Sequence, residues 1–347
     1  MRLTLTRPDD WHVHLRDGET MAAVVGHTAA RFGRAIVMPN LKPPVTTTAL
    51  AAAYRERIVA ALPVDCSFKP LMTLYLTDNT RPDEIVRAAQ SGLVHAVKYY
   101  PAGATTNSDS GVTSMDRVHA VLAKLEEVDL PFLVHGEVTD RNVDVFDREA
   151  VFIDRVLADV TRRFPRLRVV FEHVTTRDAV DFVRAAGPKI AATITPQHLL
   201  LNRNAVFEGG IRPHNYCLPV LKRESHREAL VAAATSGETQ FFLGTDSAPH
   251  PRHAKEAACG CAGIYSAHAG IELYAEAFEQ AGRLDRLEAF ASFHGPDFYG
   301  LPRNQGAITL VKETWAPPPS YAFGADALVP FRAGEHIAWR LATPGAS

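Results

Sequence analysis

Short apolar runs alternate with amphipathic stretches along most of the chain. Eight runs rich in β-branched and other apolar residues are typical of buried strands; they begin at Trp11, Arg34, Ser67, Leu93, Pro131, Arg168, Lys189 and Gln240. Between them, apolar residues recur about every 3.6 positions, which predicts helices over 20–32, 49–62, 83–91, 115–128, 148–164, 176–186, 225–236 and 267–281. Strands that alternate with helices in this way indicate an α/β protein with a parallel sheet.

The number of strand–helix units favours one particular α/β fold. Eight units are the repeat number of a (β/α)₈ or TIM barrel. We therefore expect a single domain over 1–347, with a barrel core at about 11–301 and a C-terminal extension at 302–347. In the extension only Ala307 to Val311 has a strand pattern, and the proline-rich segment that follows predicts loops. A doubly wound open sheet is the alternative, but no Gly-x-Gly-x-x-Gly motif follows the first strand.

Composition narrows the class of protein. The 347 residues are 46% hydrophobic and 22% charged, which is ordinary for a globular chain that buries a large core. The net charge of −2 excludes a strongly basic nucleic-acid binder. No apolar run reaches the roughly 18 residues of a membrane span, and no secretory signal is visible. Four cysteines are too few for a disulfide framework, so we expect a reducing, cytoplasmic location.

Polar residues capable of metal binding or proton transfer stand at the ends of several predicted strands. They are His12, His14, Asn40, Lys98, His135, His173 and Asp246. The carboxyl ends of barrel strands all meet at one mouth, where barrel enzymes build their active sites. The intervals from Lys98 to His135 and from His135 to His173 each match one strand–helix unit. We therefore expect these residues to form a single site.

The histidines at these strand ends predict a metal centre. His12 and His14 are two positions apart in a strand and so share one face. Alone, such a pair is more often one core histidine and one surface histidine. His135 and His173, one unit apart, favour metal ligation of the whole group. A nitrogen-rich set completed by Asp246 suits Zn²⁺, which is borderline-soft and redox-silent.

Lys98 has two interpretations. It ends an apolar strand close to the histidines, and a buried lysine is usually a structural residue paired with a carboxylate. Alternatively, burial near cations favours the neutral amine, which can react with CO₂. The resulting carbamate, an N6-carboxylysine at Lys98, would be an anion with two oxygens able to bridge two metal ions.

Asp246 and Arg16 suggest the chemistry of the site. Asp246 would cap a helix or turn if it acted alone, but beside a metal-bound hydroxide it would serve as general base and then general acid. Arg16 follows His14 by two positions, and Asn40 ends the neighbouring strand. Since arginine recognises carboxylates through paired hydrogen bonds, we expect a substrate with a carboxylate near the reacting carbonyl. A structural ion pair of Arg16 at the rim is the alternative.

Six motifs together resemble the dihydroorotases of the amidohydrolase superfamily, in particular the shorter bacterial type that forms homodimers. They are His12-Val-His-Leu-Arg-Asp-Gly, Val37-Met-Pro-Asn40, Val97-Lys-Tyr-Tyr-Pro, His135-Gly-Glu, Glu172-His173 and Gly244-Thr-Asp-Ser-Ala-Pro-His250. The match runs in order from about Trp11 to Leu301. It implies a zinc-dependent, reversible cyclisation of N-carbamoyl-L-aspartate to L-dihydroorotate and water, the third step of de novo pyrimidine (UMP) synthesis.

The resemblance also implies a role for each site residue. Two Zn²⁺ per subunit would be held, one by His12, His14 and Asp246 and the other by His135 and His173, with carboxylated Lys98 as the bridge. A bridging hydroxide would be the nucleophile and Asp246 the general base and acid. The substrate would be bound by Arg16, Asn40 and His250 at its carboxylate, by the backbone of Leu218 and Ala262 at its ring amides, and by Thr105 and Thr106 of a mobile loop.

Two other functions stay open at this point. Another cyclic amidohydrolase, such as a hydantoinase or allantoinase, would share the metal ligands without needing Arg16 and Asn40 to face a carboxylate. A catalytically inactive barrel that acts as a scaffold would be expected to have lost ligands, and all six are present here. We expect no nucleic-acid or membrane partner.

Overall fold

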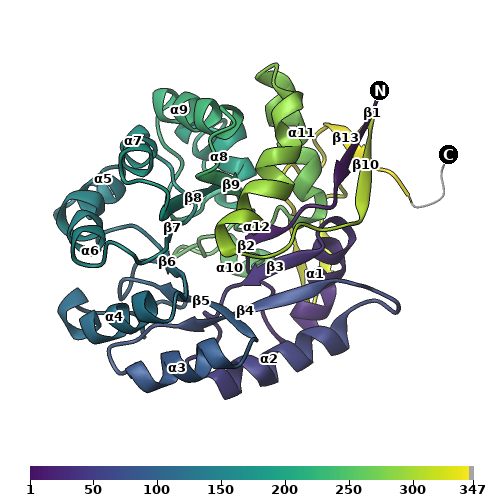
Figure 1. The fold of residues 1–347 in the computed structure, drawn as a ribbon. Coiled ribbons are helices and arrows are strands. Elements are labelled where there is room, and N and C mark those ends of the chain that lie inside the picture. Colours follow the sequence, from purple (N-terminus) through teal and green to yellow (C-terminus); the bar gives the residue numbers. More distant parts are fainter. Residues whose placement is uncertain (344–347) are drawn as a thin grey trace.

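The computed structural model describes residues 1–343, and a ring of parallel strands forms its centre (Figure 1). The strands pair in chain order: β2 (Asp10–Val13), β3 (Arg34–Val37), β4 (Lys69–Tyr75), β5 (Val94–Tyr99), β6 (Phe132–Val134), β7 (Val169–Phe171), β8 (Ile190–Ile194) and β9 (Phe241–Leu243). Each of these strands overlaps one of the eight predicted runs, and two of them extend one residue beyond it, β2 at its start and β5 at its end. The prediction of a TIM-like barrel is therefore confirmed.

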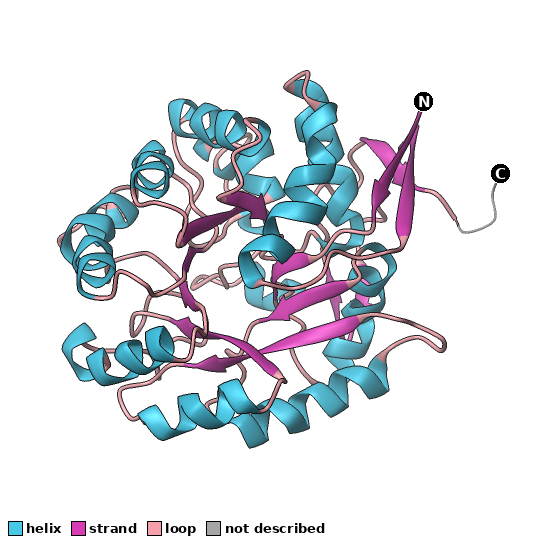
Figure 2. Cartoon of the chain, viewed as in Figure 1, coloured by secondary structure: helices cyan, strands magenta, loops and turns pink. Residues whose placement is uncertain are grey.

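Helices surround the ring, most of them on its outside (Figure 2). They are α1 (Gly18–Arg31), α2 (Thr48–Ala61), α3 (Pro82–Gln90), α4 (His119–Glu127), α5 (Arg148–Phe152), α6 (Ala158–Arg163), α7 (Arg177–Ala185), α8 (Pro196–Leu200), α9 (Glu224–Thr235), α10 (Arg252–Lys255), α11 (Gly270–Gln280) and α12 (His294–Tyr299). The helix predicted over 148–164 is divided into α5 and α6 by a π-helical turn at Ile153–Leu157. Among residues 1–343, no helix is both long and apolar enough to cross a membrane.

The first and last strands of the ring, β2 and β9, meet at a seam that closes the barrel. The main-chain N–H of Asp246 donates to the carbonyl of His12 at 2.8 Å. The buried carboxylate of Asp10 accepts from the Thr245 N–H at 2.8 Å and from the Thr245 hydroxyl at 2.6 Å. These bonds bring two of the predicted metal ligands, from opposite ends of the barrel sequence, next to each other.

The barrel interior is apolar where the strands begin and polar where they end. Its apolar part consists of Trp11, Ile36, Met38, Leu71, Ala96, Leu133, Val170, Ala191 and Phe242 together with Tyr299. The Trp11 ring stacks on Tyr299 of α12 with centroids 4.4 Å apart, which closes this end. Side chains two positions further along a strand share the same face. Lys98 after Ala96 and His135 after Leu133 therefore point into the open end of the ring.

The C-terminal extension contains more strands than the sequence predicts. β10 (Ala307–Trp315) includes the predicted strand, but the loop prediction is wrong for β11 (Tyr321–Phe323), β12 (Asp326–Leu328) and β13 (Ile337–Leu341). β10 pairs with β13 and with β1 (Arg2–Thr6), which the pattern analysis also missed. β1 and β10 pair across opposite ends of the chain, so the local sequence does not reveal their pairing. β13 pairs with β10, and β11 pairs with β12, within the extension itself. The proposed limits of the domain stay a prediction, and 344–347 lie outside the described residues.

Candidate active site

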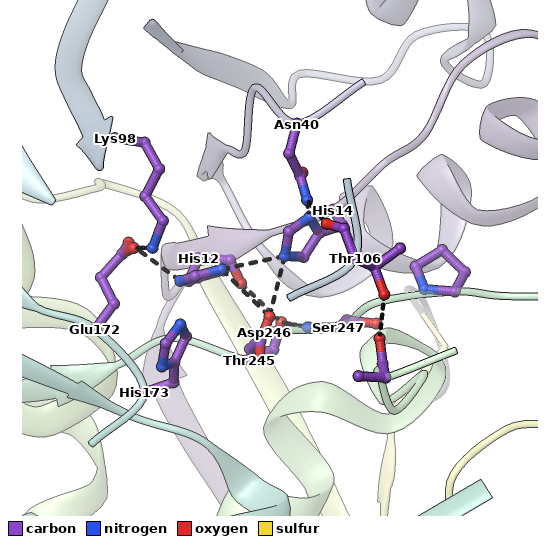
Figure 3. A network of polar contacts seen from close by, with 12 residues as sticks. His12, His14, Asn40, Lys98, Thr106, Glu172, His173, Thr245, Asp246 and Ser247 are labelled. Carbon is purple, nitrogen blue, oxygen red and sulfur yellow. Dashed lines mark hydrogen bonds and ion pairs between the residues drawn. The ribbon is translucent and has the colours of Figure 1, made fainter. Parts of the chain in front are cut away.

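The predicted ligands converge at the carboxyl end of the ring, where Figure 3 shows side chains from several strand ends facing one another. His12, His14, Lys98, His135, His173 and Asp246 are all buried. Arg16, His173 and Asp246 have φ angles of 63°, 42° and 45°, which non-glycine residues rarely adopt. Such backbone strain concentrates at functional sites, because the surrounding structure must hold it in place.

Three donor atoms lie within contact distance of one another. His12 Nε2 and His14 Nε2 lie 3.2 Å and 3.1 Å from Asp246 Oδ1, and 3.3 Å from each other. Two nitrogen ligands of one tetrahedral Zn²⁺ stand about 3.3 Å apart, since Zn–N bonds measure about 2.0–2.1 Å. His173 offers a further atom, within 4.8 Å of those of His12 and Asp246. The residues present therefore fit a bound metal ion.

Hydrogen bonds fix which nitrogen of each imidazole can face a metal ion. His14 Nδ1 lies 2.8 Å from Asn40 Oδ1, and His135 Nε2 lies 2.8 Å from Glu137 Oε2. Both oxygens only accept hydrogen bonds, so these nitrogens carry the proton and the opposite nitrogens have free lone pairs. The buried Nδ1 of His173 has no hydrogen-bond partner in the described structure. The hydrogen bonds thus leave Nε2 of His14 and Nδ1 of His135 in the form that binds metal, and Nδ1 of His173 is unpaired.

Burial and neighbouring charges set the protonation of the site. Burial, reinforced by the Arg16 charge and opposed by Asp246, lowers the pKa of His14 to about 4, so this ligand is neutral at physiological pH. Burial likewise holds the pKa of His173 well below its usual value. Burial raises the pKa of the Asp246 carboxyl, but contacts with His12 and His14 outweigh it, and the pKa lies well below its usual range. His14 and His173 are therefore neutral beside an ionised aspartate. Burial also lowers the pKa of His12, but the charges of Glu172 and Asp246 outweigh it and raise this pKa to about 9.

Glu172 is the main site residue to which the sequence analysis gave no role. Its buried carboxylate forms an ion pair with Lys98 Nζ through Oε2, and Oε1 lies 3.1 Å from His12 Nδ1. Burial lowers the pKa of Lys98, and the charge of Glu172 opposes this shift. In this structure Lys98 is thus paired with a carboxylate, that of Glu172, as one of its two interpretations expects. The carbamate stays a prediction. A signal was available, because Glu172 follows Val170 by two positions and so faces the ring interior.

A narrow cavity adjoins the donor atoms and brings most of the predicted substrate residues together. It is lined by His12, His14, Arg16, Asn40, Tyr100, Thr105, Thr106, His135, His173, Leu218, Asp246, Ala248, Ala262 and Gly263. Lys98 lies outside this lining, and His250 faces a larger outer cleft that Arg16 and Thr106 also line. Tyr100, Ala248 and Gly263 were not predicted. The cavity holds little more than about one water molecule.

The loop at 103–112 closes the cavity. Thr106 Oγ1 donates to the Ala262 carbonyl at 3.4 Å, and Asn40 Nδ2 donates to the Thr106 carbonyl at 3.2 Å. At the far end of the loop, a Cβ on Gly111 would lie 2.4 Å from the Tyr100 carbonyl, so only glycine fits there. The side chain of Asn40 is therefore shared between His14 and this loop in the closed state.

Arg16 stands where the cavity meets the outer cleft. Its Nε donates to the Pro249 carbonyl at 2.8 Å, and Nη2 lies 2.9 Å from His250 Nε2. Burial and the nearby Arg16 charge lower the pKa of His250 to about 2, so its imidazole is neutral and accepts from the guanidinium. Within residues 1–343 Arg16 forms no ion pair, which disfavours the alternative of a structural rim pair. The uncompensated charge suits an anionic ligand.

Comparisons with known proteins agree with this geometry. The amidohydrolase family matches residues 9–315. The dihydroorotase of Nitrosomonas europaea is 67% identical over 343 residues, which cover 98% of each chain. Among solved structures, the dihydroorotase of Campylobacter jejuni is 33% identical with a TM-score of 0.90 and covers 99% of this chain and 98% of its own. That of Saccharomyces cerevisiae, in complex with 5-fluoroorotic acid, is 32% identical, also with a TM-score of 0.90, and covers 98% of both.

These matches extend over nearly the whole chain, and its length fits the short bacterial type of the enzyme. The family match and the full-length relative above 60% identity agree with each other. The chain therefore belongs to the amidohydrolase family and, within it, to the dihydroorotases, enzymes that hydrolyse a cyclic amide.

Proposed function

We propose that this chain catalyses the reversible cyclisation of N-carbamoyl-L-aspartate to L-dihydroorotate and water in pyrimidine synthesis. The carrying observation is the guanidinium of Arg16, which forms no ion pair within residues 1–343 and lies beside the donor atoms of His12, His14 and Asp246. L-Dihydroorotate has a carboxylate on the ring whose amide is hydrolysed. An unpaired cation next to a metal-binding donor set matches both features of that substrate.

We further propose a binuclear zinc centre. His12, His14 and Asp246 would hold one Zn²⁺, His135 and His173 would hold the other, and Lys98, carboxylated by CO₂, would bridge them. When bound, Zn²⁺ acidifies a water molecule and polarises a carbonyl oxygen. The support is the 3.1–3.3 Å spacing of three donor atoms and the orphaned nitrogen of His173.

Asp246 would carry the proton of the reaction. Both histidine contacts fall on Oδ1, so Oδ2 is the oxygen left to accept a proton. In ring opening, Asp246 would take a proton from the attacking water and give it to the ring nitrogen as the C–N bond breaks. In ring closure the same carboxylate would take the proton from the nitrogen and return it to the departing water.

The remaining residues would bind and orient the substrate. Arg16 and His250 would hold the carboxylate. Asn40 Nδ2 would exchange the Thr106 carbonyl for a carboxylate oxygen. The main chain at Leu218 and Ala262 would face the ring amides. Because the closed cavity has no room for a six-membered ring, the loop carrying Thr105 and Thr106 must open and then close again to exclude bulk water. The homodimer and the cytoplasmic location stay predictions from the sequence.

The proposed reaction is tested by a turnover assay on zinc-loaded protein in bicarbonate buffer. Loss of L-dihydroorotate is followed by ultraviolet absorbance, with hydantoin and allantoin as parallel substrates. We expect turnover of dihydroorotate alone, abolished by a chelator and restored by Zn²⁺. Turnover of hydantoin or allantoin instead would agree with the proposed metal chemistry but contradict the proposal that Arg16 binds a substrate carboxylate. No turnover of any substrate with zinc bound would favour the inactive scaffold.

Asp246→Asn should lower turnover by at least about 100-fold, because general acid–base catalysis contributes about 10²–10⁴ and an amide cannot carry the proton. Much of the zinc should remain, since the imidazoles of His12 and His14 are unchanged. Absorbance assays and metal analysis measure the two effects. Asp65→Asn is a matched control, because Asp65 also has a positive φ, of 61°, but lies exposed on the surface. Near-normal activity of Asp246→Asn would remove this residue from the proton transfer.

Arg16→Ala should mainly raise KM for L-dihydroorotate. Hydrogen bonds to charged groups contribute about 1.5–3 kcal/mol, so we expect an increase of roughly 10- to 150-fold, with a smaller change in kcat. Arg57→Ala is the control, because Arg57 lies near the same mouth but is paired with Asp17 at 2.8 Å and is partly exposed. An unchanged KM in Arg16→Ala would contradict the carboxylate clamp.

Lys98→Ala should lose most of its zinc, because the bridging anion is gone, and short carboxylic acids should restore part of the activity. Metal analysis after dialysis checks the first expectation and activity titration with acetate or propionate the second. Glu172→Gln is the comparison, since it removes the ion-pair partner but keeps the lysine. Full zinc content in Lys98→Ala would mean that Lys98 serves only as the partner of Glu172.

A further inference from the structure

Two long loops meet beside the central cavity, and each contributes one of the predicted amide-reading residues. The loop between β8 and α9 carries Leu218, and the loop after β9 carries Ala262; both residues line the cavity. The two loops touch through a main-chain hydrogen bond from Gly263 N–H to the Tyr216 carbonyl at 3.0 Å. Neither loop has long regular structure that would fix its position by itself.

A single buried ammonium group connects these two loops. Lys255, at the end of α10, donates from Nζ to the carbonyls of Tyr216, Cys261 and Gly263 at 2.8, 2.9 and 2.7 Å. An ammonium group has three N–H donors, so all of them are used. Only 3% of Lys255 is exposed, and within residues 1–343 no carboxylate forms an ion pair with it. The three carbonyls compensate its charge together with the Tyr216 ring, whose centroid lies 5.7 Å from Nζ.

The acceptors surround the two cavity residues. Cys261 and Gly263 flank Ala262 on either side, and Tyr216 is two residues before Leu218. The loop backbone is also tightly packed at Gly263, where a Cβ would lie 2.8 Å from Ala248 and 2.9 Å from His250 Cδ2. A shift of the loop around Ala262 would therefore be passed on to the side chain that contacts Arg16.

We propose that Lys255 is a positioning residue that clamps the two loops together and thereby sets the spacing of the backbone groups at Leu218 and Ala262. It touches neither substrate nor metal. Lys255 would thereby affect recognition of the ring amides, and this part of the proposal rests on the function proposed above. The clamp itself, a lysine that holds three carbonyls from two loops, does not depend on the identity of the substrate.

The arrangement has a physical reason. A charge removed from water is costly unless its hydrogen bonds are replaced, and a loop carbonyl that points inward is also costly when left unpaired. Lys255 meets both needs, because its three donors bind three loop carbonyls that no strand pairs. Among the described residues, only the carbonyl of Tyr216 also accepts from a second donor, the Gly263 N–H. Lys255→Met keeps the length of the side chain and removes all three donors, which leaves the carbonyls to repel one another. The loops should then separate.

The test compares two ligands of the zinc-loaded protein by calorimetry. Orotate has ring amides and a carboxylate, whereas succinate has carboxylates only. We expect Lys255→Met to weaken orotate binding by about 10-fold or more, since the two hydrogen bonds from the backbone at Leu218 and Ala262 to the ring amides are lost. Succinate binding should change less than about 2-fold. KM for L-dihydroorotate should rise in parallel with zinc content unchanged. Hydrogen exchange without ligand should become faster at 214–218 and 260–264.

Lys222→Met is the matched control. Lys222 is also buried and lies in the first loop, but its Nζ donates to a single carbonyl, that of Val220 at 3.0 Å. Lys222→Met should leave the ratio of the orotate and succinate affinities within about 2-fold of that of the wild-type protein. If Lys255→Met does not fold, Lys255→Gln can replace it, because glutamine keeps two donors on a shorter side chain. Lys255→Gln should also weaken orotate binding more than succinate binding, but by a smaller factor.

Three results would overturn the proposal. Equal weakening of orotate and succinate would mean general damage, unchanged binding of both would mean no effect on recognition, and unchanged hydrogen exchange would mean that the loops hold without the clamp. Failure of the proposed function has a different signature. Wild-type protein would then not bind orotate, while faster exchange of both loops in Lys255→Met would still support the clamp.

Discussion

The structure depends on the closure of the barrel at the seam between β2 and β9. The Asp10 carboxylate and the main-chain bond from Asp246 to His12 close the ring there. Only with the ring closed do a ligand near the N-terminus and a ligand more than two hundred residues later come within 3.2 Å. The spacing of the donor atoms and the position of Arg16 therefore both depend on this seam.

The site is held together by buried charges that lack bulk water. Glu172 lies between Lys98 and His12, and Asp246 lies between His12 and His14. In such a position each carboxylate is stabilised by its neighbours and each imidazole is oriented by them, so the arrangement is rigid before any ligand binds. Unpaired atoms are informative against this background. Among the described residues of the site, the Nδ1 of His173 has no hydrogen-bond partner and the guanidinium of Arg16 has no ion-pair partner.

Metal binding and substrate recognition are built on different parts of the fold. The ligands stand at the ends of barrel strands, whose positions are fixed by the ring. The groups expected to read the substrate stand on loops, whose positions depend on a few hydrogen bonds, among them those of Lys255 and Thr106. Loops change more readily than strands in evolution, which is one physical reason why barrel enzymes with the same metal ligands act on different rings.

The amino-acid sequence by itself determined the eight strand–helix units and the residues at the strand ends, because periodic burial and strand parity are local properties. It also determined that His12, His14 and Asp246 would meet, once a ring was assumed. The pairing of β1 with β10, the partner of Lys98 and the clamp at Lys255 were decided only by tertiary structure. Each depends on a contact with a segment distant in the chain, which for Lys255 is its bond to Tyr216, 39 positions away. A pattern read along the sequence carries no record of which distant segment will supply the hydrogen bond.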